Sequence, residues 1–307
     1  MTPVSGAYDV AVVGGSFAGL AATIQLGRTR RRVLLVDAGS PRNRFTHASH
    51  GFLGQDGRSP REIVATGRAE IAAYRTVDVV EGEATTVRGA LDAFTLTLAA
   101  GVSIAARRLV LATGIVDELP GIPGLAERWG RSVLHCPYCH GFEVADQRLG
   151  VLATSEASMH QAMLIPDWST DVTLFTNGAF TPDAGQRETL RTRGVRLEER
   201  PVEALLGQAP ALSGVRLGGG SVVALDALFT TSRTRMASPL AGQLGCEFED
   251  GPFGPIIRTG PRKETTVPGV FAAGDAARAP HNATWAAADG VMAGTAAHQS
   301  LIFTAAH

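Results

Sequence analysis

Residues 8–19 read YDVAVVGGSFAG, an apolar run that leads directly into a glycine-rich turn. The β-branched residues over 8–13 predict a buried strand, and an apolar helical pattern follows over 20–26. The next buried strand is expected over 32–36, and it ends at Asp37. A strand, a glycine turn, a helix and a second strand in this order predict one βαβ unit of a nucleotide-binding α/β fold.

The turn has the spacing of a dinucleotide fingerprint in which serine replaces the middle glycine. Serine is small enough to let a pyrophosphate approach the backbone, and the helix start would supply amides and a positive dipole end. An acid about 20 residues further on would accept ribose hydroxyls. A tight structural turn would give the same short motif, but the flanking strand, helix and acid favour a nucleotide. The candidate ligands are Gly14, Gly15, Ser16, Ala18, Gly19 and Asp37.

The rest of the chain predicts a first domain split around a second one. Ser59 and Pro60 begin a helix that runs to about residue 73. The runs 77–87, 94–98 and 102–105 alternate like antiparallel strands, a buried strand follows over 109–112, and 115–125 has the composition of a linker. A strand over 270–273 and a helix from about Ala283 resemble the first domain again.

We therefore expect an α/β protein with a two-domain Rossmann-like FAD/NAD(P)-binding fold, its second domain inserted in the first. The boundaries are 1–116 plus 237–307 for the first domain and 117–236 for the second. Two strand ends, LATG and GVFAAGD, would bring a carboxylate towards the ribityl-phosphate side of a flavin, although each alone is an ordinary βα turn. Together with the fingerprint they favour FAD, with candidate ligands Thr113, Gly114, Gly274 and Asp275.

Composition excludes several classes of protein. The chain has 307 residues, 45% of them hydrophobic and 19% charged, with a net charge of -1, so neither nucleic acid nor an anionic membrane is expected as a partner. No apolar stretch reaches the roughly 18 residues that span a bilayer. A short polar lead passes directly into the first strand without the pattern of a signal peptide, so we expect a cytoplasmic protein.

The segment HCPYCHG contains two of the three cysteines, Cys136 and Cys139. A C-x-x-C at a helix start favours a thiolate and predicts redox chemistry. A zinc site is the main rival, but no second C-x-x-C completes it, so no metal is expected. His140 could move a proton during thiol exchange, or lie inert at the surface, and His135 is a weaker candidate. Cys246 is expected to be structural.

With GGSFAG, LATG, CPYCHG and GVFAAGD in this order, the sequence resembles the low-molecular-weight thioredoxin reductases over nearly its full length. The resemblance implies a homodimer in which Cys139 faces the flavin, Cys136 exchanges with substrate, and His140 replaces the family's acid/base aspartate. It also implies contacts with FAD from Gly39, Arg42, His50, Ala84 through its backbone, and Ala286 near the isoalloxazine.

The chain departs from those reductases where NADPH would bind. The strand over 149–153 is followed by Thr-Ser-Glu-Ala-Ser at 154–158, without glycine, and no Arg or Lys follows the strand over 172–175 for a 2′-phosphate. NADPH binding is therefore expected to be weak or absent. CPYCHG followed by Phe142 and Glu143 is similar to the natural-product dithiol oxidases of the gliotoxin and holomycin type. That resemblance implies a dithiol oxidase that reduces oxygen.

Two alternatives stay open. The first is a disulfide reductase that takes electrons from ferredoxin and serves a thioredoxin-like partner. The arginines at 28, 30, 31 and 32 could form its docking face, or simply a solvated helix end. The second alternative is a flavin redox sensor without turnover.

Overall fold

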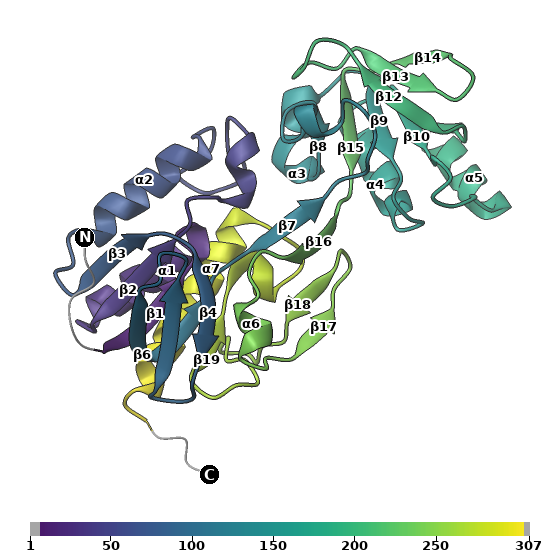
Figure 1. Cartoon of the computed structure of the whole chain (residues 1–307). Helices are drawn as coiled ribbons and strands as arrows, with labels where there is room; N and C mark the ends of the chain where they lie inside the picture. The colour runs from purple at the N-terminus through teal and green to yellow at the C-terminus, as the bar shows by residue number, and fades with distance from the viewer. Residues whose placement is uncertain (1–6, 304–307) are drawn as a thin grey trace. The chain divides into compact units, whose positions relative to one another are not determined.

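The structure, a computed structural model, describes residues 7–303, which form two compact units (Figure 1). Unit 1 takes the chain up to Arg44, then Ser59–Val116, and then Thr234 onward; unit 2 takes Phe45–Arg58 and Asp117–Arg233. The chain leaves unit 1 through β7 (Ile115–Glu118) and returns through β16 (Arg233–Met236), and these strands pair with each other. The expected linker thus begins with a strand, and the short segment 45–58 groups with unit 2.

Unit 1 is built on a seven-stranded sheet with the order β3-β2-β1-β6-β5-β4, in which β19 also pairs with β6. Strands β3, β2, β1, β6 and β19 are parallel, whereas β5 and β4 continue the sheet in antiparallel fashion. A β17–β18 hairpin completes the strands of this unit. The strands are β1 (Tyr8–Val13), β2 (Val33–Asp37), β3 (Val77–Glu81), β4 (Ala84–Arg88), β5 (Phe94–Leu98), β6 (Ser103–Leu111), β17 (Phe248–Asp250), β18 (Pro255–Ile257) and β19 (Val270–Ala272).

Alternate residues of the central strands are buried on opposite faces of this sheet. Val10 and Val12 of β1 pack with the helices α1 (Phe17–Arg28) and α7 (Ala283–Ser300). Ala11 and Val13 pack instead against β4, β5 and the short α6 (Leu240–Gln243). Burial on both faces explains why the parallel strands read as continuous apolar runs.

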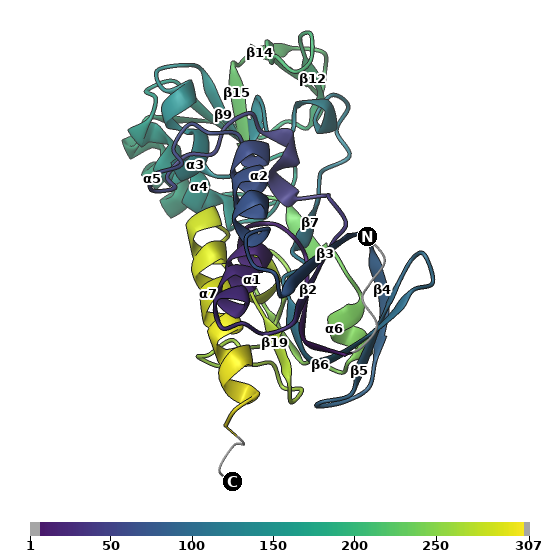
Figure 2. The ribbon, with the colours of Figure 1, turned by 90° about the vertical axis from the view of Figure 1, so that its left-hand side faces the viewer.

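Helices α1 and α7 lie side by side, as both views show (Figures 1 and 2). Glycines of α7 make this contact possible. A Cβ on Gly290 would lie 2.0 Å from the carbonyl oxygen of Ala18, and one on Gly294 would lie 2.7 Å from that of Ala22. The two helix backbones therefore touch, and residues at opposite ends of the sequence form one helix pair.

Helix α2 (Pro60–Ile71) begins where the sequence predicts. The Ser59 hydroxyl accepts from the Glu62 amide at 3.2 Å, and the Glu62 carboxylate accepts from the Ser59 amide at 3.1 Å. This capping box satisfies two backbone donors at the helix start. The predicted N-cap serine and first-turn proline are confirmed.

The strand predictions for residues 77–112 were partly wrong. The run 77–87 is divided at Gly82, which has a φ of +156°, into β3 and β4, and β3 is parallel to β2 rather than antiparallel. The runs 102–105 and 109–112 are not two strands, because β6 (Ser103–Leu111) is one strand that contains most of both. Period-two alternation shows which side chains are buried but not the direction of the neighbouring strand, so it could not separate these cases.

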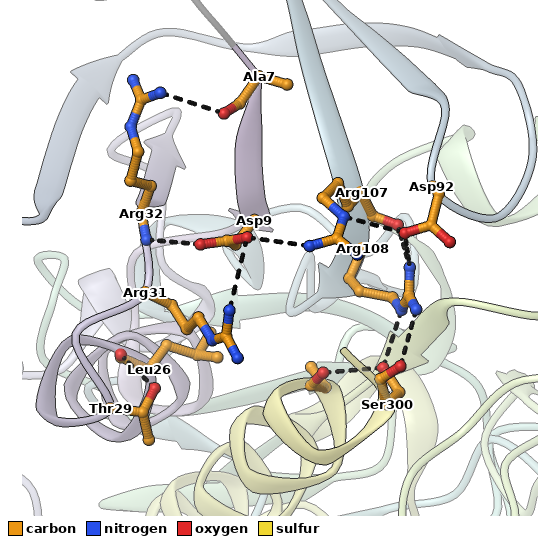
Figure 3. A network of polar contacts seen from close by, with 11 residues as sticks. Ala7, Asp9, Leu26, Thr29, Arg31, Arg32, Asp92, Arg107, Arg108 and Ser300 are labelled. Carbon is orange, nitrogen blue, oxygen red and sulfur yellow. Dashed lines mark hydrogen bonds and ion pairs between the residues drawn. The ribbon is translucent and has the colours of Figure 1, made fainter. Parts of the chain in front are cut away.

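A polar network ties β1, β6 and the end of α7 together (Figure 3). The Arg108 guanidinium is almost fully buried, and it donates to the Ser300 hydroxyl, to the Ser300 carbonyl and to Asp92, each at 2.8 Å. Arg107 is more exposed and bonds to Asp92 at 3.0 Å and to Asp9 at 3.3 Å. Arg108 thus anchors the last turn of α7 to the sheet.

The arginine run after α1 is partly neutralised within unit 1 (Figure 3). Arg31 Nη1 lies 3.9 Å from Asp9 Oδ1, and the Arg32 amide donates to Asp9 Oδ2 at 3.1 Å. The Arg32 guanidinium also lies over the ring of Tyr8, 5.3 Å from its centroid. Asp9, which also pairs with Arg107, thus offsets part of the positive charge of Arg31.

Unit 2 contains a five-stranded parallel sheet, order β11-β10-β9-β15-β8, and a three-stranded antiparallel sheet, order β12-β13-β14. Helices follow β8, β9 and β10. The strands are β8 (Val133–Leu134), β9 (Leu149–Leu152), β10 (Val172–Phe175), β11 (Val195–Glu198), β12 (Val202–Leu206), β13 (Gly214–Leu217), β14 (Val222–Ala224) and β15 (Ala227–Thr230); the helices are α3 (Pro137–His140), α4 (Ser158–Leu164) and α5 (Ala184–Thr192). Parallel βα units in both parts of the chain confirm the predicted two-domain Rossmann-like fold.

Among residues 7–303, no helix combines the length and the apolar character needed to cross a membrane.

Candidate functional site

The glycine turn between β1 and α1 leaves no room for side chains at its ends. A Cβ on Gly14, whose φ is +108°, would lie 2.1 Å from the carbonyl oxygen of Ala112, and one on Gly19 would lie 1.7 Å from the carbonyl oxygen of Gly14. Ser16 is the N-cap of α1, yet its side chain makes no capping bond. The first amides of this helix have no partner within the helix itself, and they are the groups that bind phosphates in such turns.

Asp37 lies directly against this turn. Its Oδ1 accepts from the amides of Gly15 and Gly39, both at 3.1 Å. Its Oδ2 is bound by Arg68 of α2, which also bonds to Glu81 at 2.9 Å. Arg68 is a site residue that sequence reasoning missed, because no motif marks it and it lies 31 residues from its partner.

A second group of predicted residues gathers at the end of β19. Gly274 has a φ of +72°, and a Cβ there would lie 2.9 Å from that of Ala18 and 3.6 Å from that of Ala286. Next to it, Asp275 forms an ion pair with Arg42 at 3.0 Å. Unit 1 therefore brings the start of α1, the end of β19 and the start of α7 to one edge of its sheet.

The remaining residues predicted to bind FAD differ in how much free space surrounds them. Thr113 and Gly114 follow β6 at the same edge, and a Cβ added at Gly114 would meet no other atom within 4 Å. Its φ of +68° favours glycine as well. Ala84 is buried at the start of β4, and His50 lies in the segment that groups with unit 2.

These residues fit an FAD molecule. The turn over 14–19 would hold the pyrophosphate on backbone amides, and Asp37 would hold the adenosine ribose. Gly114 and the Gly274–Asp275 pair would border the flavin side, where a side chain at Gly114 would fill open space. The backbone of Ala84 is the candidate contact for adenine.

The redox centre lies in unit 2. Cys136 and Cys139 are joined as a disulfide, with their Cα atoms 5.3 Å apart. Cys136 is the N-cap of α3, but this helix has only four residues. The predicted helix start is confirmed, whereas one turn of helix gives little of the dipole stabilisation that was expected for a thiolate.

His140 directly follows the disulfide. Burial lowers the pKa of His140 below its usual range; the charge of Glu143 raises it and that of His50 lowers it further. The rings of His50 and His140 meet edge to face, with centroids 6.1 Å apart, and His50 Nε2 lies 3.4 Å from Glu143 Oε1. A largely neutral imidazole beside the cysteines can accept a proton from a thiol.

Aromatic side chains lie in and against the segment that carries the disulfide. Gly141 provides the space for Trp168, since a Cβ on Gly141 would lie 2.8 Å from the indole ring. Trp168 in turn meets the ring of Tyr138 edge to face at 5.6 Å. Tyr138, between the two cysteines, is 72% exposed, and Phe142 is 83% exposed. The segment of the disulfide therefore exposes two aromatic rings, Tyr138 and Phe142, which we call its apolar rim.

The turn after β9, where a second nucleotide would bind, makes hydrogen bonds within itself and to two neighbouring segments. The Thr154 amide donates to the Ser158 hydroxyl at 3.1 Å, and the Thr154 hydroxyl bonds to that of Thr231 at 2.8 Å. Glu156 accepts from Gln186 at 2.7 Å. One amide of the turn is thus already used, and a carboxylate stands beside it.

The third cysteine takes no part in this centre. Cys246 is buried in the unit 1 core, burial raises the pKa of its thiol, and its sulfur lies 3.6 Å from the Thr265 hydroxyl. Its expected structural place is confirmed. Among the described residues, no group of three or more His, Cys, Asp or Glu side chains could hold a metal ion.

The family described as pyridine nucleotide-disulphide oxidoreductase matches residues 8–290. The chain belongs to this family. Thioredoxin reductase tcpT of Claviceps purpurea (strain 20.1) is 33% identical over 97% of this chain and 95% of its own length. An oxidoreductase from Agrobacterium tumefaciens superposes with a TM-score of 0.93 at 47% identity, covering 97% of this chain and 99% of its own. The structure of HlmI superposes with a TM-score of 0.89 at 41% sequence identity, and the match covers 97% of this chain and 94% of HlmI.

These matches confirm the resemblance to thioredoxin reductase-like flavoproteins. They cover both units of this pyridine nucleotide-disulphide oxidoreductase, so they include the fingerprint and the C-x-x-C alike. Membership in the family implies a bound FAD and disulfide chemistry.

Proposed function

We propose that the chain is an FAD-dependent dithiol oxidase, which closes a disulfide in a small-molecule or peptide dithiol and uses oxygen as the final acceptor. The observation that carries this direction is the turn after β9. Thr154 to Ser158 contain no glycine, the Thr154 amide is bound to the Ser158 hydroxyl, and Glu156 would repel a phosphate. Weak or absent NADPH binding removes the usual source of electrons for a reductase.

The exchange at the disulfide balances without a further reactant. One substrate thiolate attacks Cys136, the Cys136–Cys139 bond breaks, and a mixed disulfide forms. The second substrate thiol attacks the mixed disulfide, which releases the substrate as a disulfide and leaves both cysteines as thiols. His140 accepts the proton that the attacking thiol loses. When bound, FAD would take the two electrons of this dithiol and pass them to oxygen, giving hydrogen peroxide.

The apolar rim supports a small or peptidic substrate. Tyr138, which lies between the two cysteines in the chain, and Phe142 both expose their rings and can offer apolar contacts to such a substrate. Aromatic side chains at such exposure bind flat or apolar groups without needing charge complementarity. The partial neutralisation of the arginine run at Asp9 gives no support to docking of an acidic electron-transfer protein.

The test follows the flavin spectrum of the purified holoenzyme. Dithiothreitol, as a probe dithiol, should bleach the flavin without oxygen, and air should restore it with release of hydrogen peroxide. NADPH should bleach it slowly or not at all, because its phosphates lack a site. Rapid stoichiometric bleaching by NADPH would overturn the oxidase direction, and bleaching that air does not reverse would favour a sensor.

The role of Cys136 is tested by a pair of variants. Cys136→Ser should keep its flavin but lose dithiol oxidation, because no disulfide remains to be attacked. Cys246→Ser is the matched control, since that thiol is buried in the other unit. Equal turnover by Cys136→Ser and the wild type would remove Cys136 from the reaction.

A further inference from the structure

His50 comes from a segment far from the C-x-x-C in sequence, yet it lies in the same unit and against the same histidine. Its Nε2 is 3.4 Å from Glu143 Oε1, and its ring meets that of His140 at a centroid distance of 6.1 Å. Only 20% of the His50 side chain is exposed. The segment thus places a titratable ring beside the predicted proton carrier.

The segment that carries His50 is closed on itself, so this placement does not depend on a loose chain. The Ser49 amide donates to the Arg58 carbonyl at 2.8 Å, and the Gly57 amide donates to the Ser49 carbonyl at 2.9 Å. Asp56 accepts from the Gly51 amide at 2.8 Å and lies 3.7 Å from His50 Nδ1. His50 is therefore held between two carboxylates, Asp56 on one side and Glu143 on the other.

We infer that His50 is a positioning residue that acts through Glu143 to keep His140 neutral and ready to accept a thiol proton. The inference rests on the proposed function, in which His140 takes that proton. His50 does so by holding the Glu143 carboxylate, whose Oε1 lies 3.4 Å from its Nε2. Asp56, 3.7 Å from His50 Nδ1, helps to hold the ring in this place.

The physical reason is that the charges of Glu143 and His50 act on the His140 imidazole in opposite directions. Burial is the largest of the effects that disfavour the imidazolium of His140; the charge of Glu143 favours the imidazolium, and that of His50 disfavours it further. If His50 were absent, the carboxylate would act on His140 without a counter-charge. A larger share of His140 would then carry a proton already and could not accept another.

The test measures the pKa of His140 directly in the oxidised holoenzyme, by NMR of 13C-labelled histidine rings, with the signal assigned by its loss in His140→Gln. His50→Gln should raise this pKa, because both the opposing charge and part of the burial are removed. Glu143→Gln should lower it. Asp56→Asn, at a side chain that is 70% exposed, should shift it in the same direction as His50→Gln but by less.

His47→Gln is the matched control, since His47 is an exposed histidine of the same segment, and it should leave the titration of His140 unchanged. The acid limb of anaerobic flavin reduction by dithiothreitol should move with the pKa in each variant. Shifts of equal sign in His50→Gln and Glu143→Gln, or no shift in either, would overturn the inference. The NMR titration needs no turnover, so failure of the oxidase proposal would appear only in the flavin assay.

Discussion

Gly290 of α7 allows α1 and α7 to approach closely. Its replacement by alanine would shift α1 and so tests whether the position of α1 matters for FAD binding. The added Cβ would lie 2.0 Å from the carbonyl oxygen of Ala18 and 2.8 Å from its carbonyl carbon. Neither atom belongs to a side chain that could rotate away. Helix α1 must therefore move by about 1 Å or more before the added Cβ and the Ala18 carbonyl oxygen reach van der Waals distance.

The expected cost follows from two opposing effects. Overpacking a tightly packed contact costs about 1–3 kcal/mol, and because backbone meets Cβ here, we expect the upper end. Alanine gains about 1 kcal/mol over glycine in helix propensity. The difference predicts a loss of about 2 kcal/mol in the free energy of unfolding, which lowers Tm by roughly 4–8 °C.

The same shift should weaken FAD binding, because Ala18 lies in the first turn of the helix whose amides would hold the pyrophosphate. The assay compares thermal unfolding of apoprotein and the ratio of flavin to protein after gel filtration. Gly242→Ala is the control, since a Cβ on this exposed glycine would meet nothing within 4 Å. A Gly290→Ala protein with wild-type Tm and full flavin content would refute the reasoning about helix contact.

Three further predictions concern the anchor of α7, its pH dependence and the disulfide rim. Arg108→Ala should cost about 2–3 kcal/mol in unfolding free energy, because buried bonds to Ser300 are lost, whereas exposed Arg107→Ala should cost less than about 1 kcal/mol; chemical denaturation checks both. Arg108 holds the pKa of Asp92 below its usual range, so this stabilisation is present above about pH 4 and lost as the pH falls further. Asp92→Asn should therefore flatten the acid side of the stability profile, and an unchanged slope would contradict this. Tyr138→Ala should raise KM for an aromatic dithiol more than for dithiothreitol, in steady-state peroxide assays; equal effects would argue against a binding role for the ring.

Local signals predicted much of the fold. The capping box at Ser59 and the glycine fingerprint depend on residues a few positions apart, so the sequence contains all that is needed to recognise them. The cysteine pair was recognisable for the same reason. The alternation over 77–87 was misread because the direction of a strand depends on its neighbour and not on its own pattern.

Contacts between distant segments could not be predicted in this way. Nothing near Arg68 indicates that it binds Asp37, because this pairing exists only once α2 packs beside β2. The approach of His50 to Glu143 likewise depends on the segment 45–58 grouping with unit 2. The resemblance suggested that His50 lines the FAD, which stays a prediction, while its place beside His140 emerged only from the structure.

The contact between α1 and α7 also has a consequence for the order of events during synthesis. Helix α1 ends at Arg28, but its partner helix and the strand β19 come from residues 270–300. Unit 1 therefore cannot complete its core until residues 270–300 have left the ribosome, whereas every segment of unit 2 has been made by residue 233. We expect unit 2, which carries the disulfide, to fold before helix α7 of unit 1 has been synthesised.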